Sequence, residues 1–228
     1  MKAPIALALD GPDLSTVRSW VRSTAASIDT MKVGLETFLR DGEAAVSAVR
    51  ETDSRLFLDL KLHDIPNTVA GAARSIARFE PDFLTVHAAG GRAMITAAAE
   101  ALPATRITAV TVLTSLSAAD LAEIGFAGDP MSTVVRLAEL AVESGARAIV
   151  CSPQEVAAVR AAVPADVTLI TPGVRPVGAA VGDQQRVATP QQALADGADL
   201  VVIGRPITAA ADPALAAAML ASQLLADK

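Results

Sequence analysis

Aromatic residues are scarce in this chain of 228 residues, at 3%, and tyrosine is absent. This scarcity argues against the stacking platforms with which proteins bind carbohydrates or unpaired bases. Lys and Arg number 19 against 25 Asp and Glu, so the formal net charge is −6 and a nucleic acid is an unfavourable partner. The glycine-rich dinucleotide fingerprint and the phosphate-loop lysine motif are also missing, which disfavours NAD and ATP as ligands.

Cysteine occurs once, at Cys151, which excludes an internal disulfide and a zinc site of several cysteines. Cys151 has no basic neighbour and is predicted to lie in the core. No run of 18 apolar residues exists, and the mean hydropathy of +0.42 comes largely from alanine. The uncharged segment Pro213–Ala226 is too short to cross a bilayer and predicts an amphipathic terminal helix. The first residues, from Met1 to Pro4, lack the apolar core of a signal peptide, so we expect a soluble, cytoplasmic protein with no membrane partner.

Short apolar runs alternate with alanine-rich segments of helical spacing along the chain. The runs predict eight strands, at Ile5–Leu9, Thr30–Val33, Leu56–Leu60, Phe83–His87, Ile107–Leu113, Ala148–Cys151, Val167–Thr171 and Leu200–Ile203. The segments between them predict helices that include Leu14–Ala26, Gly42–Arg50, Thr68–Arg78, Met131–Glu143 and Pro153–Ala162, with a short extra helix at Ser117–Ile124. Such alternation indicates βαβ units and a parallel sheet. Eight units favour a single-domain (β/α)8 TIM barrel over residues 1–228, with a doubly wound sheet as the alternative.

Charged residues gather where the predicted strands end, which is the rim at which barrel enzymes place catalytic groups. The densest group is Asp59-x-Lys61-x-x-Asp64, at the end of the third strand. Alternation puts Asp59 and Lys61 on the same side of that strand, facing the barrel mouth, with Asp64 just beyond on the loop. Lys32, at the end of the second strand, can approach Asp59. These residues predict an alternating array in which every charge has opposite neighbours and stays ionised. A plain ion-pair network that closes the barrel is the alternative.

A phosphate site is predicted where the last two strands end, as is typical of barrels. Gly204 lets the backbone approach an anion, Arg205 offers a guanidinium group, and Pro206 suits a first helical turn. The long connection Gly173–Pro190 faces them and contributes glycine and polar residues, namely Gly173, Arg175, Gly178, Gly182, Gln184 and Gln185. The alternative is a turn that merely needs glycine, beside a surface arginine.

Five further residues allow two interpretations each. Asp10 either caps the first helix or holds a sugar hydroxyl. Thr114 and Ser115 either contact the polar edge of a heterocycle or simply end the fifth strand. His63 and His87 stand beside carboxylates, which leaves a divalent-metal site open, although structural histidines are the commoner case.

Several longer motifs follow one another in the order of a known family. The most specific is the stretch from Asp59 to Thr68, DLKLHDIPNT, together with Lys32 and the loop from Arg175 to Gln184. Further agreement lies at Leu7–Asp10, Lys32–Gly34, Val86–Gly91, Leu113–Leu116, Thr171–Pro176, Gly182–Arg186 and Ile203–Ile207. On these motifs the chain resembles the bacterial type of the orotidine 5′-phosphate decarboxylases. The DxKxxD part alone is shared by a wider group of barrel enzymes.

The resemblance implies a homodimeric barrel that converts orotidine 5′-phosphate to uridine 5′-phosphate and CO₂, the last step of UMP biosynthesis, with no metal and no organic cofactor. In the pattern of that family Lys61 is the proton donor. Lys32 and Asp59 complete the charge array with Asp64, which comes from the other subunit. The same pattern implies which residues bind each part of the substrate. Asp10 and the partner's Thr68 would bind the ribose, and Thr114 and Ser115 would bind the pyrimidine. The phosphate would be bound by Arg175, Gln184, Gly204 and Arg205.

Two alternatives remain at this stage. The 3-keto-gulonate-phosphate decarboxylases and hexulose-phosphate synthases share the DxKxxD motif but depend on a metal. They typically carry an acidic residue where this chain has Lys32, so Lys32 disfavours them. A catalytically inactive phosphate-binding barrel with a regulatory role is the other alternative, and the intact charge array disfavours it.

Overall fold

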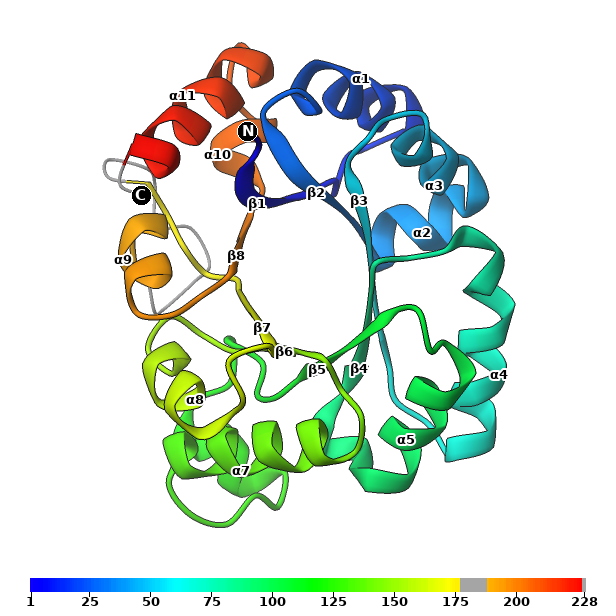
Figure 1. Cartoon of the computed structure of the whole chain (residues 1–228), viewed down its shortest axis with the longest axis vertical. Helices are drawn as coiled ribbons and strands as arrows, with labels where there is room; N and C mark the ends of the chain where they lie inside the picture. Colours follow the sequence, from blue (N-terminus) through cyan, green and yellow to red (C-terminus); the bar gives the residue numbers. More distant parts are fainter. Residues whose placement is uncertain (177–187, 227–228) are drawn as a thin grey trace.

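The computed structural model describes residues 1–176 and 188–226 and shows a closed barrel of parallel strands. The strands follow one another in chain order, and β1 pairs with β8 to close the ring (Figure 1). They are β1 Ala3–Ala8, β2 Ile28–Gly34, β3 Arg55–Leu62, β4 Phe83–His87, β5 Arg106–Val110, β6 Ala148–Val150, β7 Thr168–Thr171 and β8 Leu200–Ile203. The predicted barrel is therefore confirmed. The doubly wound alternative is excluded, because such a sheet stays open at both edges.

Helices form a ring around the strands (Figure 1). The longer ones are α1 Leu14–Thr24, α2 Leu35–Asp41, α3 Glu43–Arg50, α4 Pro66–Ile76, α5 Gly91–Ala101, α7 Pro130–Glu143, α8 Val156–Ala162 and α11 Pro213–Ala226. Shorter ones lie in the connections, namely α6 Ala118–Glu123, α9 Pro190–Ala195, α10 Arg205–Thr208 and the 3-10 turns η1 Ala77–Phe79 and η2 Ala88–Gly90. Across both described ranges, none of them combines the length and the apolar character that a bilayer-spanning helix requires.

The strand predictions hold with small shifts at the ends. The bounds of β4 and β8 agree residue for residue with the prediction. β5 ends at Val110 rather than at Leu113, because its neighbour β6 ends at Val150 and the paired register stops there. Alternation of apolar residues predicts where a strand can run, whereas the length of its neighbour decides where pairing stops.

Two helices differ from expectation in an instructive way. α4 begins at Pro66, ahead of the predicted Thr68, because proline fits the first helical position, where no amide hydrogen is needed. α11 has the predicted bounds but not the predicted amphipathic character. Leu215 and Met219 are more than half exposed, while Leu220 and Leu224 on the inner side are buried, so apolar residues occupy both faces.

The barrel interior is filled by side chains. A central cluster joins Ala6, Phe57, Phe83, Ala148, Ile170 and Leu200, which come from six different strands. The rings of Phe57 and Phe83 lie 5.6 Å apart between centroids. A larger cluster fills the layer between the strands and the helices. The barrel is thus a packed core rather than a pore, as is general for this fold.

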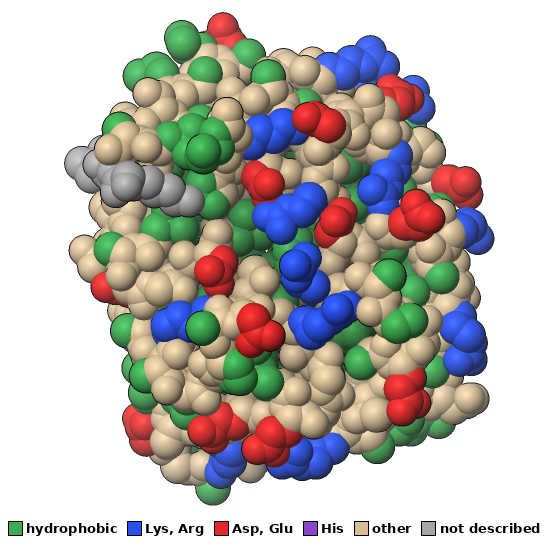
Figure 2. Space-filling view, in the orientation of Figure 1, with side chains coloured by type: hydrophobic (Ala, Val, Ile, Leu, Met, Phe, Trp, Pro, Cys, Tyr) green, Lys and Arg blue, Asp and Glu red, His purple; other side chains and the backbone are tan. Residues whose placement is uncertain are grey.

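Charged groups cover the end of the barrel at which the strands begin. The guanidinium groups of Arg55 and Arg106 lie 5.1 and 5.7 Å from the ring centroid of Phe83, and Arg55 is paired with Asp29. Figure 2 looks onto this end and shows basic and acidic side chains interspersed around its centre. Arginine over an aromatic ring is a stable arrangement at a barrel base. The cavity described below lies at the opposite end.

Candidate active site

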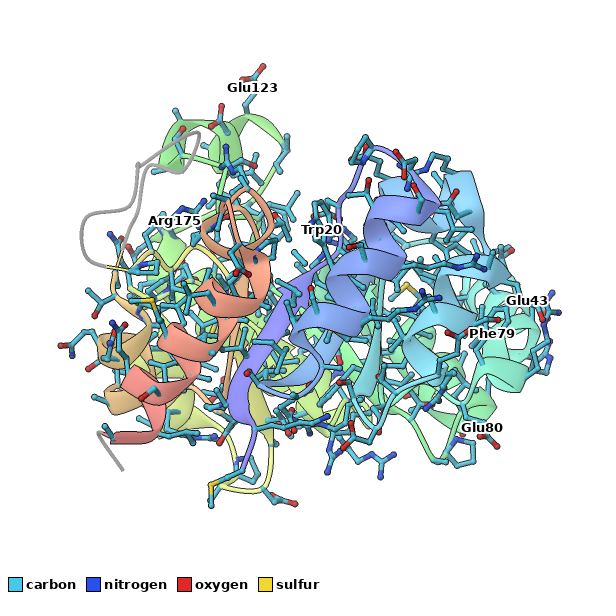
Figure 3. All side chains as sticks on the ribbon, turned by 90° about the horizontal axis from the view of Figure 1, so that it is seen from above. Trp20, Glu43, Phe79, Glu80, Glu123 and Arg175 are labelled. Atoms are coloured by element: carbon cyan, nitrogen blue, oxygen red, sulfur yellow. The ribbon has the colours of Figure 1, made fainter. Side chains whose placement is uncertain are left out.

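A cavity of about 330 Å³ opens at the carboxyl end of the strands. In the side view of Figure 3, Glu123 and Arg175 lie toward this end of the barrel, and Glu80 lies toward the other. The cavity is lined by Ala8, Asp10, Lys32, Phe57, Asp59, Lys61, Val110, Val112, Leu113, Thr114, Val150, Pro172, Gly173, Arg175, Val202, Gly204, Arg205 and Thr208. Apolar side chains thus form much of its wall, and charged groups stand at two separate places in it.

The first charged group is a linear array of alternating charges. Lys61 Nζ donates to Asp59 Oδ1 at 2.7 Å, and Lys32 Nζ lies 3.2 Å from the other carboxylate oxygen of Asp59. Lys32 Nζ also lies 3.9 Å from Asp10 Oδ1. The side chains of Lys32 and Asp59 are only 9% and 13% exposed, so their attraction is weakly screened by solvent. The sequence predicted that these groups would meet, and the structure brings them together.

The environment of Asp59 fixes its charge. Burial raises the pKa of Asp59, but the positive charges of Lys32 and Lys61 and the hydrogen bonds from Lys61 and Thr85 outweigh it. The pKa of Asp59 therefore lies below its usual range, and the carboxylate is ionised at neutral pH.

Gly34, the last residue of β2, keeps the array compact. A Cβ atom at this position would lie 2.8 Å from Asp10 Oδ1 and 3.0 Å from Lys32 Nζ. Both distances are shorter than a normal van der Waals contact, so any side chain would displace charged atoms. Glycine at the end of β2 lets Asp10 and Lys32 keep these positions without moving apart.

Asp64 does not take part in the array of its own chain, so its expected place in the site of the other subunit stays a prediction. Its Oδ1 accepts the amide hydrogen of Ile65 at 2.6 Å, and the residue is exposed. Thr68, in the first turn of α4, is also exposed, and neither residue lines the cavity. The fourth charge of the array is Asp10 instead, because β1 and β2 are neighbours and α4 turns away from the mouth.

Asp10 does not cap the first helix, so that interpretation was wrong. Asp13 is the N-cap of α1, and its Oδ1 accepts the amide hydrogen of Thr16 at 2.8 Å. The hydroxyl of Ser15 and the amide of Thr16 lower the pKa of Asp13 to about 2. With the cap supplied by Asp13, the Asp10 carboxylate is left at the edge of the cavity.

The second charged group lies on the strand 7 and strand 8 side of the cavity. Gly204, Arg205 and Thr208 line it at the start of α10, and Gly173 and Arg175 line it after β7. The N–H groups of Ile207 and Thr208 return to the carbonyl of Gly204 at 2.8 and 3.0 Å, which starts the short helix. The remaining predicted members of this site, Gly178, Gly182, Gln184 and Gln185, lie outside the described residues.

The two polar residues predicted to contact a heterocycle, Thr114 and Ser115, differ in their position relative to the cavity. Thr114 lines the cavity beside Val112 and Leu113, whereas Ser115 is exposed and does not line it. Thr114 is thus placed to contact a bound molecule in this subunit. The geometry of one subunit does not bring Ser115 to the same position.

The two histidines stack on each other at a centroid distance of 5.2 Å. Burial, followed by the charges of His63 and Lys61, holds the pKa of His87 below its usual value. Within the part of the chain that the structure describes, no three His, Cys, Asp or Glu side chains gather as a metal site would require. Cys151 is buried as predicted, and burial raises the pKa of its thiol to about 12.

Sequence reasoning missed one residue of the site. Thr85 is fully buried in β4, where its hydroxyl contacts both the backbone of Lys61 and the carboxylate of Asp59. The only signal in the sequence is a hydroxyl in an otherwise apolar strand, which is too common to single out a residue. The contact depends on a shift of register between β3 and β4, and only the tertiary structure shows that shift.

A closed barrel with an apolar-walled, charged cavity at the carboxyl end of its strands defines a (β/α)8-barrel enzyme. The sequence model of the Orotidine 5′-phosphate decarboxylase / HUMPS family matches residues 3–220, and the chain belongs to this family. It is 65% identical to the orotidine 5′-phosphate decarboxylase of Thermobifida fusca strain YX, over 98% of this chain and 97% of the relative. It is 53% identical to the enzyme of that name from Frankia casuarinae, over 99% of this chain and 89% of the relative.

Solved structures agree with the sequence relatives. The orotidine 5′-phosphate decarboxylase of Lactobacillus acidophilus superimposes with a TM-score of 0.84 at 34% identity, covering 98% of this chain and 99% of that structure. The enzyme of that name from Pyrococcus horikoshii OT3 gives a TM-score of 0.80 at 26% identity, covering 97% and 99%. The resemblance that the motifs indicated therefore extends to the whole fold.

Proposed function

We propose that this protein decarboxylates orotidine 5′-phosphate to uridine 5′-phosphate and CO₂, the last step of UMP biosynthesis, and that it does so without a metal or an organic cofactor. The observation that carries the proposal is the ammonium group of Lys61, held by Asp59 at 2.7 Å in a cavity whose other side presents Arg205. The family match and the 65% identity to a protein of that name support it.

The chemistry requires a positive charge at one carbon atom. When the C6 carboxylate leaves as CO₂, the electron pair of the broken bond stays on C6, where the ring offers no adjacent electron sink. Lys61 can stabilise this pair as it develops and then transfer an Nζ proton to C6, which gives the C–H bond of the product. The resulting neutral amine regains a proton from solvent. Atoms and charges balance with the substrate and this one lysine.

Lys32 and Asp59 hold Lys61 in a fixed orientation. Asp59 accepts from Lys61 and is itself held by Lys32 on β2, so the ammonium of Lys61 has a fixed direction before substrate binds. Asp64 of the partner subunit would add a further negative charge beside the same lysine. This role is assigned by the family pattern and fits the outward placement of Asp64 in its own chain.

The remaining residues each bind a different part of the substrate. Gly204, Arg205, Arg175 and Gln184 hold the phosphate, with a bidentate guanidinium contact as the strongest interaction. Asp10 and the partner's Thr68 hold the ribose hydroxyls. Thr114 and Ser115 address the pyrimidine. Binding energy from the phosphate, which is remote from C6, can then be used to hold the ring against Lys61.

A homodimer with shared active sites accounts for the exposed residues near the mouth. Ile65, between Asp64 and Thr68, is 67% exposed, and Leu39 on α2 is 79% exposed. Large apolar side chains at such exposure favour burial against another protein surface. A two-fold dimer through α2 and the start of α4 would bury them and carry Asp64 and Thr68 to the partner's cavity. We propose that this single-domain dimer is the functional form, in the cytoplasm.

Lys32 distinguishes this function from that of the metal-dependent members of the wider group. A metal ligand at this position has to be an anion or a neutral donor, whereas Lys32 is a buried cation paired with Asp59 at 3.2 Å. The Lys32 ammonium at this position would repel a divalent metal ion. It supports a site that is built from side-chain charges alone. The same intact array disfavours an inactive phosphate-binding barrel.

The test is direct, because orotate absorbs ultraviolet light differently from uracil. Purified protein mixed with orotidine 5′-phosphate should deplete the orotate absorbance and release uridine 5′-phosphate in equal amount. Orotidine without phosphate serves as a control and should react far more slowly. A protein that binds uridine 5′-phosphate but leaves the absorbance unchanged would be the inactive barrel instead.

Chelation separates the proposal from the metal-dependent alternative. Because Lys32 occupies the position of an acidic metal ligand, turnover should be unchanged after exhaustive treatment with EDTA and removal of the chelator. Turnover that disappears with EDTA and returns with Mg²⁺ would favour the metal-dependent relatives and contradict this mechanism.

A further inference from the structure

The strand that carries the charged residues leaves regular geometry at Lys61. The φ angle of Lys61 is +47°, and in the described ranges only Glu80 shares a positive φ among the non-glycine residues. The pairing of β3 with β4 shifts register between Leu58 and Leu62, around this residue. A non-glycine residue in the left-handed region is strained, so its surroundings must hold it there.

Thr85 on β4 makes the contacts that hold it. The amide of Lys61 donates to Thr85 Oγ1 at 2.8 Å, and Thr85 Oγ1 lies 3.0 Å from Asp59 Oδ1. An amide can only donate and a carboxylate can only accept, so the Thr85 hydroxyl accepts from Lys61 and donates to Asp59. One hydroxyl therefore links the backbone of the proton donor to the side chain that orients its ammonium.

The location of Thr85 makes these bonds strong and difficult to replace. Its side chain is fully buried in the barrel wall, where water cannot take over a lost hydrogen bond. Thr85 is also not among the residues that line the cavity. Asp59 Oδ1 is shared between Lys61 Nζ and Thr85, which leaves Oδ2 to Lys32.

We propose that Thr85 is a positioning residue for the decarboxylation. Its hydroxyl holds the backbone of Lys61 in the left-handed conformation. The same hydroxyl holds the Asp59 carboxylate in the orientation that directs the ammonium of Lys61 into the cavity. This inference rests on the proposed function, in which Lys61 is the proton donor. A buried residue of β4 would then take part in catalysis in a way that none of the cavity-lining residues does.

Thr85→Val tests the proposal, because valine keeps the shape of threonine and removes only the hydroxyl. The variant should lower kcat by roughly 10- to 100-fold, since small errors in the placement of a catalytic group are costly. KM should change by less than about threefold, because the phosphate end of the cavity is untouched. Thr85→Ser keeps the hydroxyl and should return kcat to within a few-fold of wild type. Thr85→Ala removes the hydroxyl without a new methyl contact and gives a second measurement if the valine variant folds poorly.

The pH profile separates positioning from mere stability. Asp59 is faced by Lys32 on β2, Lys61 on β3 and His87 on β4, and the hydrogen bond from Thr85 is among the causes that lower its pKa. Loss of that bond raises the pKa of Asp59. The acid limb of kcat for Thr85→Val should therefore move to higher pH, whereas the limb for Thr85→Ser should stay in place.

Thr108→Val is the matched control. Thr108 on β5 is also fully buried, its hydroxyl donates to the carbonyl of Arg106 at 3.0 Å, and it does not line the cavity. The control should lose stability like Thr85→Val but keep kcat and its acid limb. Suppose that wild type is active, that Lys61→Ala is inactive, and that Thr85→Val and Thr108→Val have the same kcat and pH profile. The positioning role of Thr85 is then wrong, while the proposed function stands. If wild type itself does not turn over, the proposed function fails.

Discussion

Two lysines on neighbouring strands share one carboxylate, and this arrangement decides what each residue of the site can do. Lys32 is almost fully buried and faces carboxylates on two sides, which suits a fixed charge. Lys61 is more exposed to the cavity and contacts Asp59 through one oxygen only, which suits a group that gives up a proton. The difference in environment, and not the residue type, separates the two roles that we propose for these lysines.

Lys61→Ala should remove nearly all turnover while the fold stays intact. In the mechanism that we propose, the lysine both stabilises the carbanion and protonates it, and each role is worth at least about 3 kcal/mol, or more than 100-fold in rate. Single-turnover decarboxylation measured by absorbance, with circular dichroism as the check on folding, tests this expectation. A variant within tenfold of wild type would exclude Lys61 as the proton donor.

Arg205→Ala should act on substrate binding through the phosphate. Loss of a desolvated ionic contact lowers kcat/KM by roughly 2–4 kcal/mol, or about 30- to 1000-fold. The same change should have little effect on orotidine, which lacks the phosphate. Comparing the two substrates on wild type and variant gives the answer, and equal losses on both would show that Arg205 is needed for structure instead.

Glycine has a different role after the end of helix α9 than inside helix α4. α9 ends at Ala195, and Gly197 follows with a φ angle of +111°. A Cβ atom there would lie 2.8 Å from Cγ of Arg160, whose guanidinium group donates to the carbonyls of Val167 and Pro164. Gly71, by contrast, sits inside α4 with no atom nearer than 3.9 Å to a Cβ.

Alanine at these two glycines should therefore change stability in opposite directions. Gly197→Ala introduces backbone strain and a clash, and should lower the free energy of unfolding by about 1–3 kcal/mol. Gly71→Ala should raise it by about 0.5–1 kcal/mol, because alanine restricts the unfolded chain and favours the helix. Urea denaturation followed by circular dichroism measures both, and a shift of the same sign in both variants would contradict the assignment.

At the scale of the whole molecule, the open question is whether one barrel holds a complete site. Lys61 lines the cavity of its own chain, whereas Asp64 lies on the outer surface of the loop that follows β3. The proposed dimer would bring Asp64 of the partner subunit to that cavity. Each active site would then combine residues of two chains.

Mixing two inactive variants tests the shared site. Lys61→Ala and Asp64→Ala are combined under conditions that exchange subunits. In a hybrid dimer one site takes Lys61 from one chain and Asp64 from the other and is intact, while the second site carries both lesions. Random exchange makes about half of the dimers hybrid, so roughly a quarter of the sites should recover activity. Activity that stays at the level of the separate variants would mean that both residues serve the same site from one chain.

Local patterns in the sequence carried most of the fold and the charged part of the site. Strand β4 has the bounds that its apolar run predicted, and helix α11 begins and ends where the composition changes. Asp59 and Lys61 share a side of β3 because side chains alternate along a strand, and Lys32 meets them because parallel strands end at the same rim. These features depend on the periodicity of apolar residues and on the order of strands and helices, and both can be read directly from the sequence.

Only the tertiary structure decided the features that depend on register between strands and on the path of a loop. The shift between β3 and β4 places Thr85 against Lys61 and Asp59, and it cannot be read from either strand alone. After β3 the chain leaves Asp64 outside its own cavity, whereas Asp10, two residues after the end of β1, joins the array through Lys32. Sequence determines which groups a strand presents, whereas the packing of neighbouring strands determines which atoms finally meet.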